Sequence, residues 1–169
     1  DLSRMYIQKG GGKDLLANYL EQLVTEREFS GDYVISAADL KTKIDAKETM
    51  TLVDTRGIGA AAETAQNAIT INWKDISLSD KQTGNNKRAA GDEGFARSLP
   101  AADMGQKLGA LGLGLNDQII LFSDGHVSGG WGDDGRIAWQ LFQCGYTNVK
   151  MVNGGLAAMK TAGIPVQKG

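Results

Sequence analysis

Residues 119–136 read IILFSDGHVSGGWGDDGR, and this stretch decides the fold of the chain. It begins with a short apolar run that is typical of a buried strand. It continues through a loop that contains five glycines and reaches a helical pattern at Arg136. A strand that leads through a glycine-rich loop into a helix N-terminus is where α/β proteins hold ligands, because loop N–H groups and the helix dipole favour an anion. We therefore expect the functional site here.

Segments with strand and helix patterns alternate on both sides of this stretch. The apolar runs that predict strands lie at residues 33–35, 50–53, 68–73, 118–122 and 149–152. The patterns with helical spacing lie at residues 37–46, 101–111, 136–144 and 156–162. Strands that alternate with helices predict an α/β domain with a mainly parallel central sheet and helices on both of its faces. Between these segments we expect a loop with one short helical turn over 57–66 and a polar, solvated loop over 75–98.

The N-terminal part differs in character from the rest. Residues 1–13 are polar and predict a leader without regular structure. Residues 14–28 place leucine and tyrosine at helical spacing on one face and polar side chains on the other, which predicts an amphipathic helix. We therefore divide the chain into an N-terminal helical extension at 1–32 and a single domain at 33–169. The helix either covers an edge of the domain or docks it to a partner or a second copy.

Composition limits the classes of partner. The chain has 169 residues, enough for one domain with a real apolar core, and a net charge of -2. This charge argues against nucleic acid and acidic membranes, because both attract a basic face. The single cysteine excludes an internal disulfide and a zinc site built from several thiolates. No apolar run is long enough for a membrane span.

The first residue bears on the location of the protein. The sequence begins at Asp1 rather than at methionine, so we expect that a targeting segment or a tag has been removed. A cleaved export signal would place the protein in the periplasm. The cytoplasm is the alternative location.

Several segments resemble the rhodanese-like (sulfurtransferase) family. The closing part matches best, from Gly145-Tyr146-Thr147-Asn148-Val149 through the double glycine Gly154-Gly155 to Gly163-Ile164-Pro165. Ile35–Leu40 is similar to the opening segment of the family, Leu52–Arg56 to its Asp-x-Arg strand end, and Arg136–Trp139 to the helix start after its active loop. The resemblance covers about residues 33–167 and implies a single rhodanese-like domain.

The resemblance places Ser123 where active family members carry a cysteine that accepts sulfur as a persulfide. A thiol has a pKa of about 8.5 that oriented amides lower, and its sulfur acts both as a nucleophile and as a leaving group. A serine hydroxyl needs an adjacent base and forms no S–S bond. The chain also departs from the family at residues 63–68, where a Gly-His-Ile-Pro-Gly-Ala segment is replaced, and in the longer loop from Ser123 to Arg136. Ser123 is therefore expected to be inactive in sulfur transfer.

Three functions follow from these residues, in order of preference. The first is a pseudoenzyme, a non-catalytic binding or regulatory module in the metabolism of sulfur compounds or related oxyanions. It would bind a small anionic sulfur compound or a protein partner. The second is a thiosulfate-type sulfurtransferase, in which Ser123 is either native or an engineered replacement for cysteine. The third is a hydrolase in which His126 activates Ser123 and an aspartate orients the imidazole.

The expected binding residues surround the same loop. They are Asp54, Arg56, Asp124, Gly125, His126, Trp131 and Arg136. A divalent ion held by Asp124, His126, Asp133 and Asp134 is an alternative, but an aspartate that caps the helix near Gly135 is the favoured interpretation. We therefore expect no metal and no cofactor.

Two other features have structural interpretations. Cys144 is expected on the buried face of its helix, as a small apolar side chain. Lys81, Lys87, Arg88 and Arg97 give the loop over 75–98 a basic bias. That bias lines either an anion site or, as we expect, a solvated loop.

Overall fold

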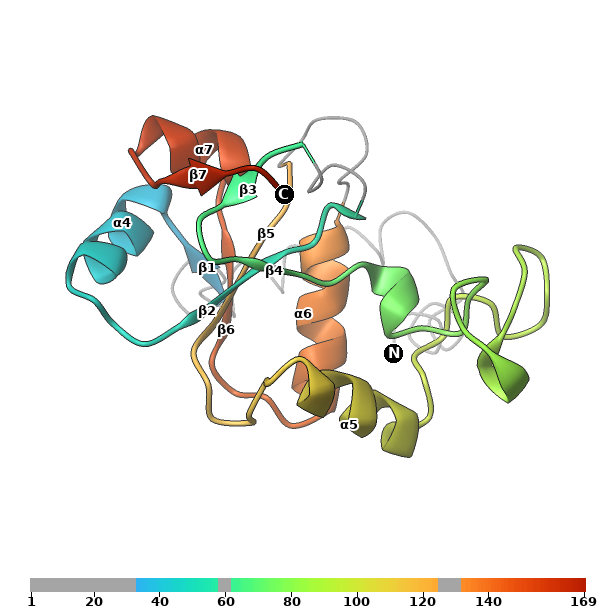
Figure 1. The fold of residues 1–169 in the computed structure, drawn as a ribbon. Helices are drawn as coiled ribbons and strands as arrows, with labels where there is room; N and C mark the ends of the chain where they lie inside the picture. Colours follow the sequence, from blue (N-terminus) through green and yellow to red (C-terminus); the bar gives the residue numbers. More distant parts are fainter. Residues whose placement is uncertain (1–32, 58–61, 125–131) are drawn as a thin grey trace, which may run out of the picture. The chain divides into compact units, whose positions relative to one another are not determined.

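The computed structural model describes residues 33–57, 62–124 and 132–169, and Figure 1 shows how their helices and strands are arranged. The compact unit that carries the sheet runs from Ile35 to Gly169. The predicted leader and amphipathic helix lie outside the described residues. The domain boundary between residues 32 and 33 stays a prediction.

A five-stranded sheet forms the centre, with its strands in the order β1-β6-β5-β2-β4. The strands are β1 (Val34–Ile35), β2 (Thr51–Asp54), β4 (Ile69–Thr70), β5 (Ile119–Phe122) and β6 (Val149–Val152). β5 pairs in parallel with β2 and with β6, and β2 pairs in parallel with β4. The carboxyl ends of these strands therefore meet at one edge of the sheet. The predicted α/β fold with a mainly parallel sheet is confirmed.

Both faces of β5 are buried, and its alternating side chains separate two apolar cores. Ile119 and Leu121 belong to the core that contains side chains of α5 (Ala101–Ala110) and α6 (Asp133–Gln143). Ile120 and Phe122 belong to the core that contains side chains of α4 (Ala37–Asp45) and α7 (Gly155–Thr161). Helices therefore cover both faces of the sheet, with α4 and α7 on one side and α5 and α6 on the other (Figure 1). This double burial explains why the strand is a continuous apolar run.

The predicted signals at the starts of two helices are confirmed, and a third helix starts earlier than expected. Ser36 caps α4, because its side-chain oxygen accepts a hydrogen bond of 3.0 Å from the N–H of Asp39. Gly154 precedes α7 and has a φ of 82°, a left-handed conformation that glycine adopts without strain. α6 begins at Asp133 rather than at Arg136.

A second, two-stranded sheet was not predicted. β3 (Thr64–Ala65) pairs in antiparallel fashion with β7 (Val166–Gln167), and the register aligns Ala65 with Val166. The loop expected over 57–66 is therefore wrong at Thr64 and Ala65, which form a strand, and residues 58–61 of it lie outside the described residues. Each of these strands has two residues, which is too short for an alternating pattern to be recognised.

The segment between β4 and α5 is more ordered than the predicted solvated loop. Two 3-10 helices, η2 (Trp73–Asp75) and η3 (Gly84–Asn86), lie in it. Ile76, Ser77, Ser79 and Gln82 are buried, so the expectation of a solvated loop is wrong at these positions. Ser77 pairs with Ser98 in an isolated antiparallel bridge, and Gln82 donates hydrogen bonds to the carbonyls of Lys74 and Asp75 at 2.7 Å and 3.0 Å. These contacts join parts of the segment to one another and give it a defined structure.

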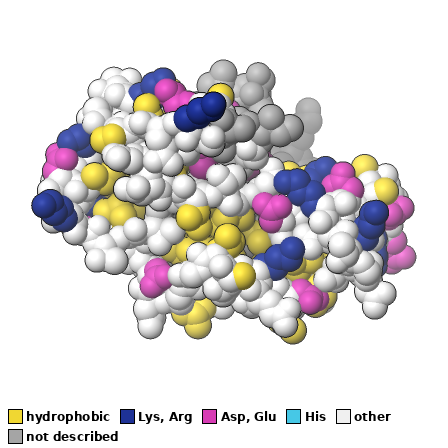
Figure 2. Space-filling view, viewed as in Figure 1, with side chains coloured by type: hydrophobic (Ala, Val, Ile, Leu, Met, Phe, Trp, Pro, Cys, Tyr) yellow, Lys and Arg dark blue, Asp and Glu magenta, His cyan; other side chains and the backbone are white. Residues whose placement is uncertain are grey.

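Charged side chains of both signs are mixed over the face of the molecule that Figure 2 shows. Apolar side chains gather near the middle of that face, where α6, α5 and η2 lie close together in Figure 1. None of the helices in the described ranges combines the length and the apolar character that crossing a membrane requires.

Replacing Gly154 by alanine tests the turn that leads into α7. An added Cβ at this position would lie 2.7 Å from the Cβ of Ala158, and the backbone is left-handed. We expect Gly154→Ala to lower the free energy of unfolding by at least about 1–2 kcal/mol in a urea titration followed by circular dichroism.

Gly105→Ala is the matched control for this substitution. Gly105 lies in the interior of α5, and an added Cβ there meets nothing within 4 Å. The control should gain about 0.5–1 kcal/mol, because alanine is the better helix former. Equal stability of Gly154→Ala and the unmodified chain would contradict the strained turn.

Candidate functional site

The candidate site lies at the carboxyl edge of the sheet, where β2 and β5 end side by side. The register aligns Asp54 with Phe122, so the residues that follow these two strands are neighbours. Thr55 donates hydrogen bonds of 3.0 Å to the carbonyl of Phe122 from both its backbone N–H and its hydroxyl. Ser123 follows β5 directly and is 2% exposed, and its carbonyl accepts a hydrogen bond of 2.8 Å from the N–H of Leu156 in α7. Ser123 is thus part of the packed edge of the sheet.

A buried carboxylate, that of Asp54, organises the end of β2. Asp54 is fully buried and forms a bidentate ion pair with Arg56. The Nε of Arg56 lies 3.0 Å from Oδ1 of Asp54, and Nη2 lies 2.8 Å from Oδ2. The backbone N–H of Arg56 and the hydroxyl of Thr64 donate to the same carboxylate at 3.0 Å and 2.7 Å. These donors satisfy a charge that would otherwise be costly to bury.

Two further N–H groups of the Arg56 guanidinium are also engaged within the chain, so that four of its five have acceptors. Nη1 donates to Oδ1 of Asp124 at 3.0 Å, and Nη2 donates to the carbonyl of Glu63. The Asp54 hydrogen bonds are the main cause that raises the pKa of Arg56, and burial opposes them. Asp54, Arg56 and Asp124 together carry one positive and two negative charges. The charge of the Arg56 guanidinium is thus matched by two carboxylates of its own chain, which disfavours the binding of an incoming anion.

The structure brings three of the predicted binding residues together, namely Asp54, Arg56 and Asp124. Sequence reasoning missed Thr64 and Glu63. Thr64 lies in a segment that shows no recognisable strand or helix pattern. Glu63 contributes only its backbone carbonyl, and because every residue has one, the residue type carries no signal for this contact.

Arg136, a fourth predicted binding residue, makes its contacts elsewhere. Its guanidinium lies over the ring of Trp73, with Cζ 4.2 Å from the ring centroid. Its Nη2 donates to the carbonyl of Ala96 and lies 3.5 Å from the Oγ of Ser77. Burial lowers the pKa of Arg136, and the charge of Asp133 opposes this effect. Arg136 therefore joins α6 to the segment between β4 and α5.

Two carboxylates stand at the N-terminus of α6, but neither caps the helix as predicted. The N-cap position is Gly132, which has a φ of 72° and no side chain to accept a hydrogen bond. Asp133 and Asp134 lie in the first turn, and the carboxylate of Asp134 accepts a hydrogen bond of 2.8 Å from the N–H of Gly135. Burial raises the pKa of Asp133. When ionised, both side chains occupy the positive end of the helix dipole, where an anionic ligand would otherwise bind.

Gly125, His126 and Trp131 lie outside the described residues. The predicted pairing of His126 with Ser123 and its role in a metal site therefore stay predictions. Within 33–57, 62–124 and 132–169, no group of three His, Cys, Asp or Glu side chains is placed to hold a metal ion.

Cys144 is exposed, so its predicted place on the buried face of the helix is wrong. α6 ends at Gln143, and Cys144 is the C-cap residue before Gly145, which has a φ of 99°. The chain therefore leaves the helix before Cys144 can follow Leu141 into the core, and Tyr146 is buried there instead. Partial desolvation raises the pKa of the Cys144 thiol, which is the opposite of what a reactive cysteine needs.

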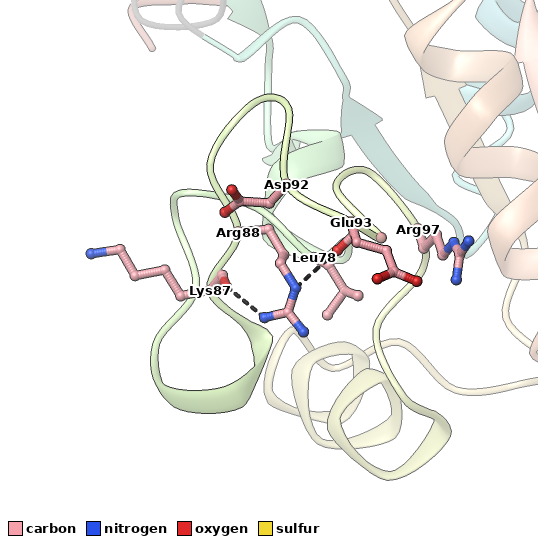
Figure 3. A pocket seen from close by; sticks show the side chains of 7 residues that line it. Leu78, Lys87, Arg88, Asp92, Glu93 and Arg97 are labelled. Carbon is pink, nitrogen blue, oxygen red and sulfur yellow. Dashed lines mark hydrogen bonds between the residues drawn. The ribbon is translucent and has the colours of Figure 1, made fainter.

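A hollow of about 490 Å3 gathers three of the four basic residues of the 75–98 segment (Figure 3). Arg88 lies between Lys87 and Glu93, and its guanidinium donates to the carbonyls of Asn85, Lys87 and Glu93. Lys87 extends away from the hollow, and Arg97 lies on its opposite side (Figure 3). Because Asp92 and Glu93 also line the hollow, it carries charges of both signs. The Arg88 side chain holds the loop together and forms no isolated cationic site.

The fold is similar to those of solved sulfurtransferases. The 3-mercaptopyruvate sulfurtransferase from Leishmania major has a TM-score of 0.61 and 19% identity, over 84% of this chain and 38% of that one. SseA from Escherichia coli, a 3-mercaptopyruvate sulfotransferase described with the "Rhodanese" fold, has a TM-score of 0.59 and 16% identity, over 82% and 52%. The thiosulfate sulfurtransferase from Pseudomonas aeruginosa has a TM-score of 0.51 and 18% identity, over 80% and 20%.

At these identities the likeness shows the rhodanese-like fold alone. The chain spans about half the length of the Escherichia coli protein and smaller shares of the other two. A scan against protein-family models finds no match, and a search of curated protein sequences finds none either.

The Asp54–Arg56 pair is expected to be essential for stability. Arg56→Met leaves the Asp54 carboxylate buried without its counter-charge, so the free energy of unfolding should fall by about 3–5 kcal/mol. The fall is measured by urea unfolding of the purified variant.

Lys160→Met is the matched control, because it removes the same kind of charge from an exposed pair. Lys160 lies 2.6 Å from Glu63, and the two side chains are 49% and 40% exposed. The control should change the free energy of unfolding by about 1 kcal/mol at most. Similar small losses in both variants would show that the buried pair does not organise the edge of the sheet.

Proposed function

We propose that this chain is a rhodanese-fold binding module that does not transfer sulfur, and that its partner is a protein rather than a small sulfur oxyanion. One observation carries the proposal. Ser123 follows the central strand β5 directly, at the position that the family resemblance assigns to the sulfur-accepting cysteine. The side chain that would carry the sulfur-transfer chemistry therefore ends in a hydroxyl and not in a thiol.

The chemistry of sulfur transfer explains why this substitution is decisive. The acceptor must attack a sulfur atom as an anion and must then release that sulfur to a second acceptor. A thiolate does both, since its pKa lies within reach of neutral pH and it forms a bond that later breaks. A hydroxyl stays protonated at neutral pH unless a base removes its proton, and it has no sulfur to form a disulfide-type bond. Ser123 is also 2% exposed, which does not favour direct attack on a ligand.

The charges at the same edge support a protein partner over a small oxyanion. The Arg56 guanidinium is neutralised by Asp54 and Asp124. Asp133 and Asp134 place two carboxylates at the entrance to α6. A small sulfur oxyanion would meet these negative charges without a free cation among the described residues of this edge. A protein surface brings its own complementary groups and does not need one.

The test is sulfur transfer from thiosulfate to cyanide, with intact-mass analysis of the protein after exposure to thiosulfate alone. We expect neither thiocyanate nor a protein adduct of one sulfur atom. The matched variant is Ser123→Cys, which restores the thiol at the end of β5 without changing any charged residue. We expect no persulfide on Ser123→Cys either, because the carboxylates at this edge disfavour the binding of thiosulfate. A persulfide on Ser123→Cys would assign the inactivity of the unmodified chain to the hydroxyl alone and would contradict the exclusion of a small sulfur oxyanion.

Cys144→Ala controls for the one natural thiol, which is exposed. An adduct that disappears in Cys144→Ala would be a side reaction of that thiol. Turnover or an adduct in the unmodified chain that survives Cys144→Ala would contradict the proposal.

A further inference from the structure

A second hollow, of about 350 Å3, lies between α6 and the residues that precede α5. It is lined by residues 96–98 on one side and by Arg136, Trp139, Gln140 and Gln143 of α6 on the other. We call it the α6 groove. It contains none of the residues of the Asp54–Arg56 group or Ser123, so it is a different surface from the candidate site.

Trp139 is the first unusual feature of the α6 groove. Its side chain is 61% exposed, although Ile137, Ala138 and Leu141 of the same helix are buried in the core. Tryptophan loses much of its favourable transfer energy when it faces water, and it is enriched where proteins bind partners. Trp73, by comparison, packs edge-on against Phe95 with ring centroids 5.8 Å apart. The exposed indole of Trp139 is therefore a candidate anchor for a partner.

The charge of the α6 groove is the second unusual feature. Arg97 and Arg136 line it, no acidic residue does, and neither arginine has a salt bridge within the described residues. Asp133 acts on Arg136 only at longer range. Arg97 also lines the first hollow, where Figure 3 shows Glu93 between Arg97 and Arg88. The groove is thus basic in a chain whose net charge is -2.

The third feature is an unsatisfied acceptor beneath the groove. Gln140 is 3% exposed, and its Nε2 donates to the Oγ of Ser77 at 3.1 Å and to the Oγ of Ser98 at 2.9 Å. Its Oε1 is the one buried side-chain polar atom in the described ranges that has no hydrogen-bond partner. An unpaired buried acceptor is unfavourable, so a donor group is expected to reach it when the groove is filled.

We propose that the α6 groove docks an acidic segment of a partner protein, which packs an apolar side chain on Trp139 and places a carboxylate on Arg97. The exposed indole supplies the apolar part of this recognition and Arg97 the electrostatic part. Arg136, whose guanidinium packs on Trp73 and donates to the carbonyl of Ala96, adds positive charge beside them. The proposal extends the binding role proposed above but does not depend on the chemistry of Ser123. Substitutions in the groove are not expected to change the result of the sulfur-transfer assay. Each of the two proposals can therefore be contradicted without the other.

The test uses a synthetic, fluorescein-labelled peptide in which glutamates alternate with leucines around a central phenylalanine. A second peptide with lysine in place of every glutamate is the charge control. Fluorescence anisotropy at low salt should show saturable binding of the acidic peptide to the full chain, and the indole N–H resonance of Trp139 should shift. Added salt should weaken the binding, because part of it is electrostatic.

Matched variants locate the binding on the groove. Trp139→Ala and Arg97→Glu should each weaken it by about tenfold or more, as expected for anchor residues of an interface. Leu115→Ala removes another exposed apolar side chain, and Lys107→Glu makes the same charge reversal on the exposed face of α5. These controls should bind within about twofold of the unmodified chain, since surface changes away from the contact have small effects. Arg97→Glu should also gain affinity for the lysine peptide.

Three results would overturn the proposal. One is the absence of saturable binding of the acidic peptide at millimolar concentration. Another is equal binding of both peptides, or equal loss in the groove variants and their controls. The last is a shift of the Trp139 indole resonance by thiosulfate or phosphate alone at matched ionic strength, which would identify a small-anion site.

Discussion

The ion pair between Asp54 and Arg56 is the interaction on which the edge of the sheet depends. It places a fully buried carboxylate at the end of β2 and surrounds it with donors from Arg56 and Thr64. Through Nη1 it reaches Asp124, which follows β5, and through Nη2 it reaches the carbonyl of Glu63 beside β3. One guanidinium thus joins the end of β2 to the nearby residue Glu63 and to Asp124, which is distant in sequence. A pair of this kind stabilises the fold only when both partners are present.

The same interaction limits what the edge of the sheet can bind. In a parallel α/β fold, ligands bind at the carboxyl ends of the strands. Here the arginine at that edge, Arg56, is neutralised by carboxylates of its own chain. The first turn of α6 carries Asp133 and Asp134, and the residue that follows β5 is Ser123. Arg97 and Arg136, which have no salt bridge within the described residues, lie on the α6 groove instead. This distribution of charge is the reason for proposing a protein-binding role in place of anion chemistry at the strand ends.

The sequence predicted well those elements that have either a long pattern or a capping signal. β5 was recognisable from its continuous apolar run, α4 from Ser36, and α7 from the double glycine at Gly154. The short strands β3 and β7 escaped prediction because two residues cannot show a period. Cys144 was misplaced because helical spacing continues the face of Ile137 and Leu141 to position 144, although α6 ends at Gln143 and Cys144 is its exposed C-cap residue.

Prediction of the candidate site was limited for a different reason. Asp54 and Arg56 were found because charged residues at the carboxyl end of a buried strand lie on the ligand-binding edge of the sheet, and Asp124 because it lies in the loop after the central strand. Arg136 has the same residue type as Arg56, but its partners on the segment between β4 and α5 depend on tertiary packing that no local pattern encodes. The assignment of Ser123 to the position of a catalytic cysteine stays a prediction, since the similar structures share the fold at low identity.

The central claim is that Arg56 is neutralised within the chain and does not receive a small oxyanion. A titration of thiosulfate into protein with isotope-labelled arginine side chains, followed by NMR, tests it most directly. We expect the chemical shift of the Arg56 Nε–H resonance to remain unchanged up to millimolar thiosulfate at constant ionic strength. A saturable shift of that resonance, retained when Arg97 is replaced by alanine, would contradict it.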